Sequence, residues 1–206
     1  MIADNRGTGT VFIVDDEEPI CDSISLLLRS VGIASRTYAD PLQFLGEYTA
    51  DQPGCLVIDV RMPGMSGLEV QRILNERRCS LPLIFITGHG DVPMAVEAMR
   101  SGAFDFLQKP FNDDDLIRRV QKALEQDARE RAELEQTDEI RRRWESLTAR
   151  EREIALMLVE GAANKAVALD LSISERTVEL HRARIMQKME VRSLAQLVKM
   201  ALTLQR

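Results

Sequence analysis

The chain has 206 residues, of which 45% are hydrophobic and 29% charged, a balance typical of globular proteins and unlike that of disordered or collagen-like chains. A length above the usual size of one domain favours two domains. No apolar run is long enough to cross a bilayer, and the N-terminus lacks the pattern of a secretion signal, so we expect a cytoplasmic protein with no membrane partner. Three cysteines without CxxC spacing and two distant histidines argue against a disulfide framework or a histidine-based metal site.

Charge is divided unevenly along the chain. Residues 1–123 carry 12 basic and 18 acidic side chains, residues 124–145 carry 5 and 8, and residues 146–206 carry 10 and 7. Only the last segment has a positive net charge. A basic module behind an acidic one suggests a nucleic-acid-binding part joined to a part with another task, although a solvated surface with surplus lysine and arginine gives the same excess.

From Thr10 to Phe111, short apolar runs alternate with helix-length stretches, the pattern of strands buried on both faces of a parallel sheet. We expect five strands and five helices, the strands at Val11–Val14, Ile33–Thr37, Leu56–Ile58, Leu83–Ile86 and Phe104–Leu107. The first turns of the intervening helices are marked by prolines or capping residues at Pro19, Pro41, Ser66 and Asp91.

Residues 112–145 contain no glycine or proline and are rich in helix formers, which predicts one long helix whose first part packs and whose second part is an exposed linker. A coiled-coil dimer is an alternative, but few apolar residues recur at heptad spacing. After Leu147, four short helical patterns predict a helix-turn-helix bundle, with Thr148 and Glu151 as a capping box and Ser174 opening the third helix. The predicted domains are residues 1–124 and 146–206, joined by a helical linker at 125–145.

Polar side chains follow the carboxyl ends of the predicted strands, where the loops of a parallel sheet converge. They are Asp15, Asp16, Asp59, Thr87 and Lys109. Three carboxylates placed together repel one another unless they share a cation, and hard oxygen ligands suit Mg²⁺. Such a site can take a phosphoryl group onto a carboxylate, and Asp59 is the natural nucleophile. Taken singly, each aspartate is better explained as a helix cap, but their joint occurrence with Lys109 and Pro110 after the last strand favours a site.

The segments VDDEEP, IDVRMPGMSG, FITGHGD and FLQKPF resemble the receiver domain of two-component response regulators, over about residues 10–124. The resemblance implies a flavodoxin-like (βα)5 fold of the α/β class. It implies that Asp59 is the phosphoacceptor, and that Asp15, Asp16 and the backbone carbonyl of Arg61 hold Mg²⁺ with it.

The same resemblance assigns roles to residues near the ends of the last two strands. Thr87 matches the hydroxyl that hydrogen-bonds the phosphoryl oxygen, and Lys109 matches the phosphate-binding ammonium, with a cis bond to Pro110. Phe106 matches an aromatic switch that turns inward; a plain core aromatic is the alternative.

Residues 147–203 resemble the LuxR-type output domain of the FixJ-like group of response regulators, an all-α four-helix helix-turn-helix domain. In such domains the second helix of the motif, expected at Glu175–Met189, enters the major groove, while the first, about Asn164–Leu171, rests across the backbone. Val178 faces either the bases or the core, and Glu179 stands where many family members have lysine. The candidate DNA-binding residues are Lys165, Thr177, Glu179, Arg182, Arg184 and Lys188.

These observations predict a phosphorylation-switched transcription factor. A sensor histidine kinase phosphorylates Asp59, the face around Val92–Phe106 changes, and the receivers form a homodimer that binds promoter double-stranded DNA. RNA polymerase is a further candidate partner. We expect no enzymatic activity beyond slow loss of the protein's own phosphoryl group. One alternative is an aspartyl-phosphate phosphohydrolase, against which Arg61 argues because such sites carry a second aspartate there; the other is a constitutive DNA-binding regulator with a non-switching receiver.

Overall fold

A computed structural model of the chain describes residues 9–88 and 92–204. The chain divides into two compact units, Met1–Arg131 and Ala132–Arg206. The division falls inside one long helix, α5, Asp113–Glu145, which coincides with the predicted long helix.

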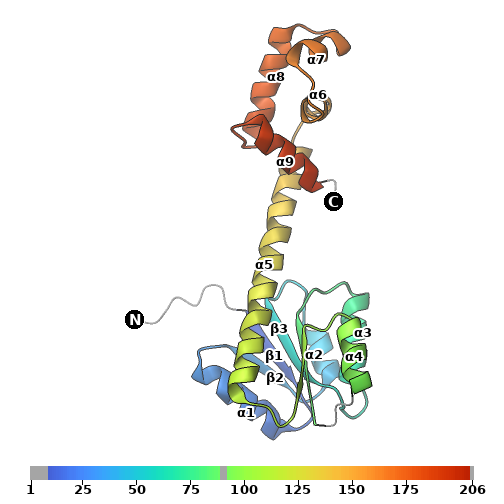
Figure 1. The fold of residues 1–206 in the computed structure, drawn as a ribbon, viewed down its shortest axis with the longest axis vertical. Coiled ribbons are helices and arrows are strands. Elements are labelled where there is room, and N and C mark those ends of the chain that lie inside the picture. Colours follow the sequence, from blue (N-terminus) through green and yellow to red (C-terminus); the bar gives the residue numbers. More distant parts are fainter. Residues whose placement is uncertain (1–8, 89–91, 205–206) are drawn as a thin grey trace. The chain divides into compact units, whose positions relative to one another are not determined.

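The first unit is built on a five-stranded parallel sheet in the order β2-β1-β3-β4-β5 (Figure 1). Every residue of β3 and β4 is buried, which is why these strands are continuous apolar runs in the sequence. The strands are β1 Thr10–Val14, β2 Ser35–Tyr38, β3 Gly54–Asp59, β4 Leu83–Thr87 and β5 Asp105–Gln108.

The second strand begins later than predicted. The backbone N–H of Ile33 donates to the carbonyl of Leu28, so Ile33 closes the turn that ends the preceding helix instead of opening β2. Its buried side chain packs in the core from that turn. An apolar residue beside a strand therefore misled the prediction by two residues.

Helices cover both faces of the sheet (Figure 1). Residues of α1 and α5 pack in one core cluster with one face of the strands, and residues of α2, α3 and α4 pack in the other. The helices of this unit before α5 are α1 Glu18–Ser30, α2 Pro41–Glu47, α3 Gly67–Glu76 and α4 Val92–Arg100.

The predicted helix starts have a clear local cause where they are described. Asp40 caps α2 by accepting from the N–H of Leu42, and Pro41 occupies the first turn. Ser66 and Glu69 form a reciprocal capping box at the start of α3. Asp91, the predicted cap of α4, lies outside the described residues.

The second unit is a bundle of four short helices with its own core, and with the sheet unit it confirms the predicted fold class. Thr148 and Glu151 form the predicted capping box of α6, and Ser174 accepts from the N–H of Thr177 at the start of α8. No helix in the described part of the chain is long and apolar enough to span a membrane. The four helices are α6 Ala149–Val159, α7 Asn164–Asp170, α8 Glu175–Lys188 and α9 Leu194–Leu204.

The end of α5 differs from the prediction. Ile140 is 6% exposed, and Trp144 packs against the core of the second unit. The expectation that the whole second part of the long helix is exposed is therefore wrong for its last turns, which belong to the packed structure of the second unit.

Candidate functional sites

Two carboxylates and one ammonium meet at the carboxyl edge of the sheet. The Lys109 Nζ donates to Asp15 Oδ2 at 2.7 Å and lies 3.1 Å from Asp59 Oδ1. Asp15 is fully buried and Asp59 is 6% exposed. The structure thus brings together predicted residues from three different strand ends.

Local backbone geometry holds the two carboxylates in place. Asp59 Oδ2 accepts from the N–H of Arg61 at 2.6 Å, and Asp15 Oδ1 accepts from the N–H of Glu17 at 3.0 Å. Gly67, the first residue of α3, packs so closely that a Cβ there would lie 2.4 Å from the carbonyl oxygen of Asp59. Only glycine allows α3 to begin directly against the strand end that carries Asp59.

Lys109 and Thr87 lie at the ends of neighbouring strands. The backbone N–H of Lys109 donates to the carbonyl of Thr87 at 2.8 Å, and the Lys109–Pro110 peptide bond is cis. Thr87 is buried. The side chains of both residues therefore arise at the same edge of the sheet as Asp59.

Burial dominates the electrostatics of Asp59. It raises the pKa of the Asp59 carboxyl above its usual range, although the nearby Lys109 ammonium acts in the opposite direction. Burial also lowers the pKa of Lys109, but the hydrogen bonds to Asp15 and Asp59 outweigh it and leave that pKa raised. The site therefore holds a charged lysine beside a carboxylate that is poorly solvated.

The donor set suits a hard divalent cation only in part. Asp15 and Asp59 supply carboxylate oxygens, the ligand type that Mg²⁺ takes. These oxygens already share one cationic partner, the Lys109 ammonium. The predicted third carboxylate, Asp16, is exposed. Within residues 9–88 and 92–204, no three acidic, histidine or cysteine side chains converge closely enough to enclose a metal ion.

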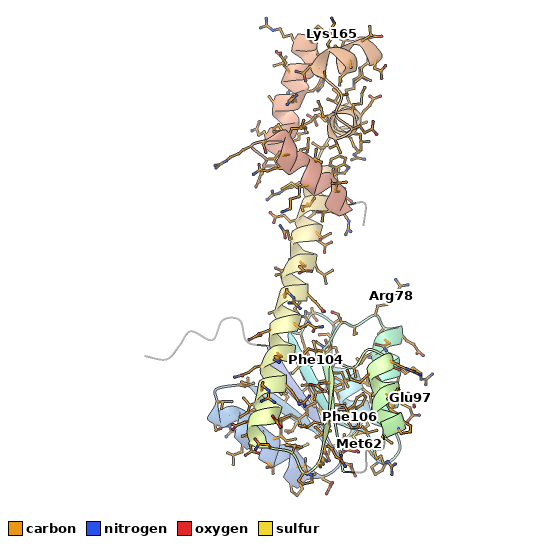
Figure 2. All side chains as sticks on the ribbon, viewed as in Figure 1. Met62, Arg78, Glu97, Phe104, Phe106 and Lys165 are labelled. Carbon is orange, nitrogen blue, oxygen red and sulfur yellow. The ribbon has the colours of Figure 1, made fainter. Side chains whose placement is uncertain are left out.

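The remaining predicted residues of this unit flank the carboxylates. Phe106, on β5, is half-buried, and its ring centroid lies 6.4 Å from that of Phe85 within the core face covered by α2, α3 and α4 (Figure 2). Arg61 has an exposed side chain and takes part in the site through its backbone.

In the second unit, α7 and α8 form the helix-turn-helix, and the predicted residues fall into two groups. Lys165, Glu179 and Arg184 are exposed (Figure 2 labels Lys165, on α7), and Thr177 is half-buried at the start of α8. Val178 is fully buried, so of the two orientations considered for it the core is the observed one.

The other two basic candidates are bound within the unit. Arg182 Nη1 donates to Asn164 Oδ1 at 2.9 Å, which ties α8 to the start of α7. Lys188 Nζ lies 2.6 Å from Oε2 of the buried Glu151 and also donates to the carbonyl of Ser146. A lysine held by a buried carboxylate is less available to a DNA phosphate than one in solvent.

The exposed face of α8 contains further residues outside the predicted DNA-binding set. Arg176, Leu180 and Gln187 are exposed and recur with Arg184 at helical spacing, and Leu180 is 57% exposed. The spacing from the buried Val178 and Ile185 is the signal that would have found this face. It offers a guanidinium, an amide and an apolar group, all of which can contact base edges in a major groove.

Comparison with known proteins decides the family. Residues 11–121 match the family described as the response regulator receiver domain. Residues 145–201 match the family described as bacterial regulatory proteins, luxR family. The transcriptional regulatory protein FixJ of Rhizobium meliloti is 46% identical over 94% of this chain and 95% of its own length. The chain belongs to the response regulator family. Its two units are a receiver and a LuxR-type DNA-binding domain, as in the FixJ-like group.

Solved structures agree with this assignment. The response regulator StyR is 42% identical and superposes with a TM-score of 0.88 over 94% of this chain and 98% of its own. Full-length FixJ from B. japonicum is 38% identical with a TM-score of 0.58 over 96% and 97% of the two chains. This response regulator is a two-component transcription regulator with a DNA-binding output domain.

Proposed function

We propose that Asp59 is the phosphoacceptor of this response regulator and that a sensor histidine kinase is the donor. The observation that carries the proposal is the shared Lys109 ammonium, which brings Asp59 and Asp15 together at the sheet edge. In the transfer, an Asp59 carboxylate oxygen forms a bond to phosphorus while the phosphorus–nitrogen bond of the kinase phosphohistidine breaks. The histidine nitrogen keeps the electron pair of the broken bond.

The surrounding residues stabilise the charge that the phosphoryl group brings. Lys109 already lies beside Asp59, so its ammonium neutralises a phosphoryl oxygen without a large rearrangement. The Thr87 hydroxyl hydrogen-bonds another oxygen. Asp15, Asp16, Asp59 and the Arg61 carbonyl would hold Mg²⁺, which supplies further positive charge to the phosphoryl oxygens when bound. Water later attacks the same phosphorus while the bond from phosphorus to the Asp59 oxygen breaks. Inorganic phosphate leaves and Asp59 returns to its carboxylate form, which gives the slow self-dephosphorylation.

The phosphorylated receiver then forms a homodimer. A phosphoryl group adds a charge of about −1.5 to −2 at the end of β3. Thr87 and Lys109 move toward this phosphoryl group, and Phe106 turns inward with them. The paired surface includes α4, where Val96 is 41% and Met99 46% exposed, an apolar exposure that association would bury. Two receivers together place two α8 helices on adjacent half-sites of promoter DNA, where RNA polymerase is a further partner.

The first test is phosphorylation of the full-length protein by acetyl phosphate with Mg²⁺, followed by intact mass. We expect the wild type to gain one phosphoryl group and Asp59→Asn to gain none. Asp51→Asn is the matched control, because Asp51 is an exposed aspartate just before β3, at the strand's other end. Equal labelling of the wild type and Asp59→Asn would disprove the assignment.

The second test addresses the switch. Genome-wide capture of DNA by the wild type, with and without acetyl phosphate, should yield promoter fragments that are enriched by phosphorylation. Equal capture under both conditions would instead establish the constitutive DNA-binding regulator.

The label on Asp59 should decay over time in the purified protein, and a label that persists would contradict self-dephosphorylation.

A further inference from the structure

The last turn of α5 binds the C-terminal end of the DNA-reading helix. Arg143 Nη1 donates to the carbonyl of Met189, the residue that caps α8, at 3.4 Å, and Arg143 Nη2 lies 2.9 Å from Glu190 Oε2. The Arg143 side chain is 22% exposed. Because the last carbonyls of a helix lack intrahelical partners and carry partial negative charge, a guanidinium there stabilises the helix end.

In a second contact, a side chain of α8 donates to the backbone just after α5. Lys188, the last residue of α8, donates to the carbonyl of Ser146, which directly follows α5. Trp144 packs into the core that also holds Ile185 and Met189 of this helix region. We call these interactions of Arg143, Trp144 and Lys188 the α5–α8 contact.

The middle of α5 has polar contacts of its own inside the receiver. The buried Asp127 accepts from the N–H of Gly54 and from Arg131, and Arg131 also donates to the carbonyls of Ala50 and Gln52. One continuous helix therefore has polar, partly buried contacts in both units, with exposed residues such as Leu134 between them.

We propose that Arg143 is a positioning residue of the DNA-reading helix, which couples the linker helix to α8. A change in the receiver that rotates or shifts α5 then reaches α8 directly through the α5–α8 contact, and the DNA affinity of α8 responds to phosphorylation through it. This inference rests on the proposed function. Without Arg143, α8 keeps its core packing and its Lys188–Glu151 ion pair, so the unphosphorylated protein should still bind DNA.

The experiment compares full-length Arg143→Met with Arg141→Met. Arg141 lies on the same helix and pairs with Asp138 in an exposed ion pair, so its substitution removes the same charge without touching α8. DNA affinity is measured with and without acetyl phosphate on a promoter duplex recovered by the wild type. Phosphorylation should raise the DNA affinity of Arg143→Met at least fivefold less than it raises that of the wild type. Arg141→Met should respond to phosphorylation as the wild type does. Arg143→Lys, which retains the charge, should recover part of the lost stimulation.

The single tryptophan, Trp144, gives a second measurement that a merely structural role would not change. Its emission should shift on phosphorylation in the wild type and in Arg141→Met, and stay constant in Arg143→Met. Equal stimulation and an equal shift in both variants would overturn the inference. The inference would also be overturned if Arg143→Met failed to bind DNA in the absence of phosphodonor and its Trp144 emission were that of an unfolded chain. A wild type that shows no stimulation would refute the proposed function instead.

Discussion

Each unit of the chain contains a lysine beside buried carboxylate, and the two arrangements differ in electrostatic balance. In the receiver, Lys109 is shared by Asp15 and Asp59, and burial raises the pKa of Asp59. In the output domain, Lys188 pairs with one carboxylate, that of Glu151. This hydrogen bond, together with the one from the N–H of Thr148, lowers the pKa of Glu151 to about 2.

The difference separates the proposed phosphorylation site from a structural ion pair. Two carboxylates that share one ammonium keep surplus negative charge in a poorly solvated place, which a further cation would relieve. The single Glu151 carboxylate is balanced in charge by one lysine, and a backbone N–H donates to it as well. The same residue types therefore suit the proposed chemistry in one unit and stability in the other.

The largest expected effect comes from removing the lysine of the balanced pair. Lys188→Met leaves the Glu151 carboxylate buried without a cation, and the unfolding free energy of the output domain should fall by about 2–3 kcal/mol, less than for a fully buried pair because Lys188 is 36% exposed. Urea unfolding followed by Trp144 fluorescence measures it.

Lys165→Met is the control for that substitution. Lys165 is exposed on α7, so its loss should leave stability within about 0.5 kcal/mol of the wild type. It should weaken DNA binding and reduce its salt dependence, as expected for a phosphate contact. If Lys188→Met unfolds at the same urea concentration as Lys165→Met, the pair is not the structural contact described above.

The pH dependence of the two carboxylates should have opposite signs. The pKa of Glu151 is lowered from 4.5 to about 2. The contribution of its ionised carboxylate to the unfolding free energy of the output domain is therefore complete above pH 4.5 and is lost as the pH falls through 2. The pKa of Asp59 is raised, so its charge opposes folding of the receiver at neutral pH, and acidification through that raised pKa relieves the opposition.

Urea unfolding at pH 5 and pH 3 tests the Glu151 sign. Trp144 fluorescence should show the wild-type output domain losing about 1–2 kcal/mol more than Glu151→Gln between these values, a figure reduced for the partial exposure of Lys188. Hydrogen exchange of β3 amides should show Asp59→Asn more stable than the wild type at pH 7, with a smaller gap at pH 4. If acidification changed the stability effects of Glu151→Gln and Asp59→Asn in the same direction, the comparison of the two carboxylates would be contradicted.

The sequence predicted the receiver site better than the output domain contacts, for a physical reason. Strand ends of a parallel sheet converge by topology, so Asp15, Asp59 and Lys109 could be placed together without knowing any side-chain rotamer. The pairing of Lys188 with Glu151 depends on how α6 packs on α8. No local pattern encodes this packing, so the sequence could not show that Lys188, a candidate phosphate contact, is bound by Glu151.

The end of α5 illustrates the same limit. Ile140 and Trp144 are spaced one helical turn apart, which indicates an apolar face, but only the structure shows that Ile140 is buried and that Trp144 packs against the second core. Conversely, Ile33 is apolar and buried yet belongs to a turn, because its N–H closes the end of α1. Periodicity predicts that a residue is buried before it predicts the element that buries it.

The smallest expected effect is one that the two units should share. Arg78, at the end of α3 (Figure 2), and Ser172, between α7 and α8, have φ values of 56° and 52°, in the left-handed region that follows many helices. Glycine removes the strain of about 1–2 kcal/mol at such a position, and its greater freedom in the unfolded chain costs about 0.5–1 kcal/mol.

Arg78→Gly and Ser172→Gly should therefore each raise the unfolding free energy of their own unit by about 0.5–1 kcal/mol. Both side chains are exposed, so little packing is lost. Hydrogen exchange of α3 and α8 amides reports the two units separately. Similar gains would show that the units have comparable backbone constraints, so that their difference lies in the buried charges. A loss in either variant would mean that the replaced side chain contributes more than its backbone strain costs.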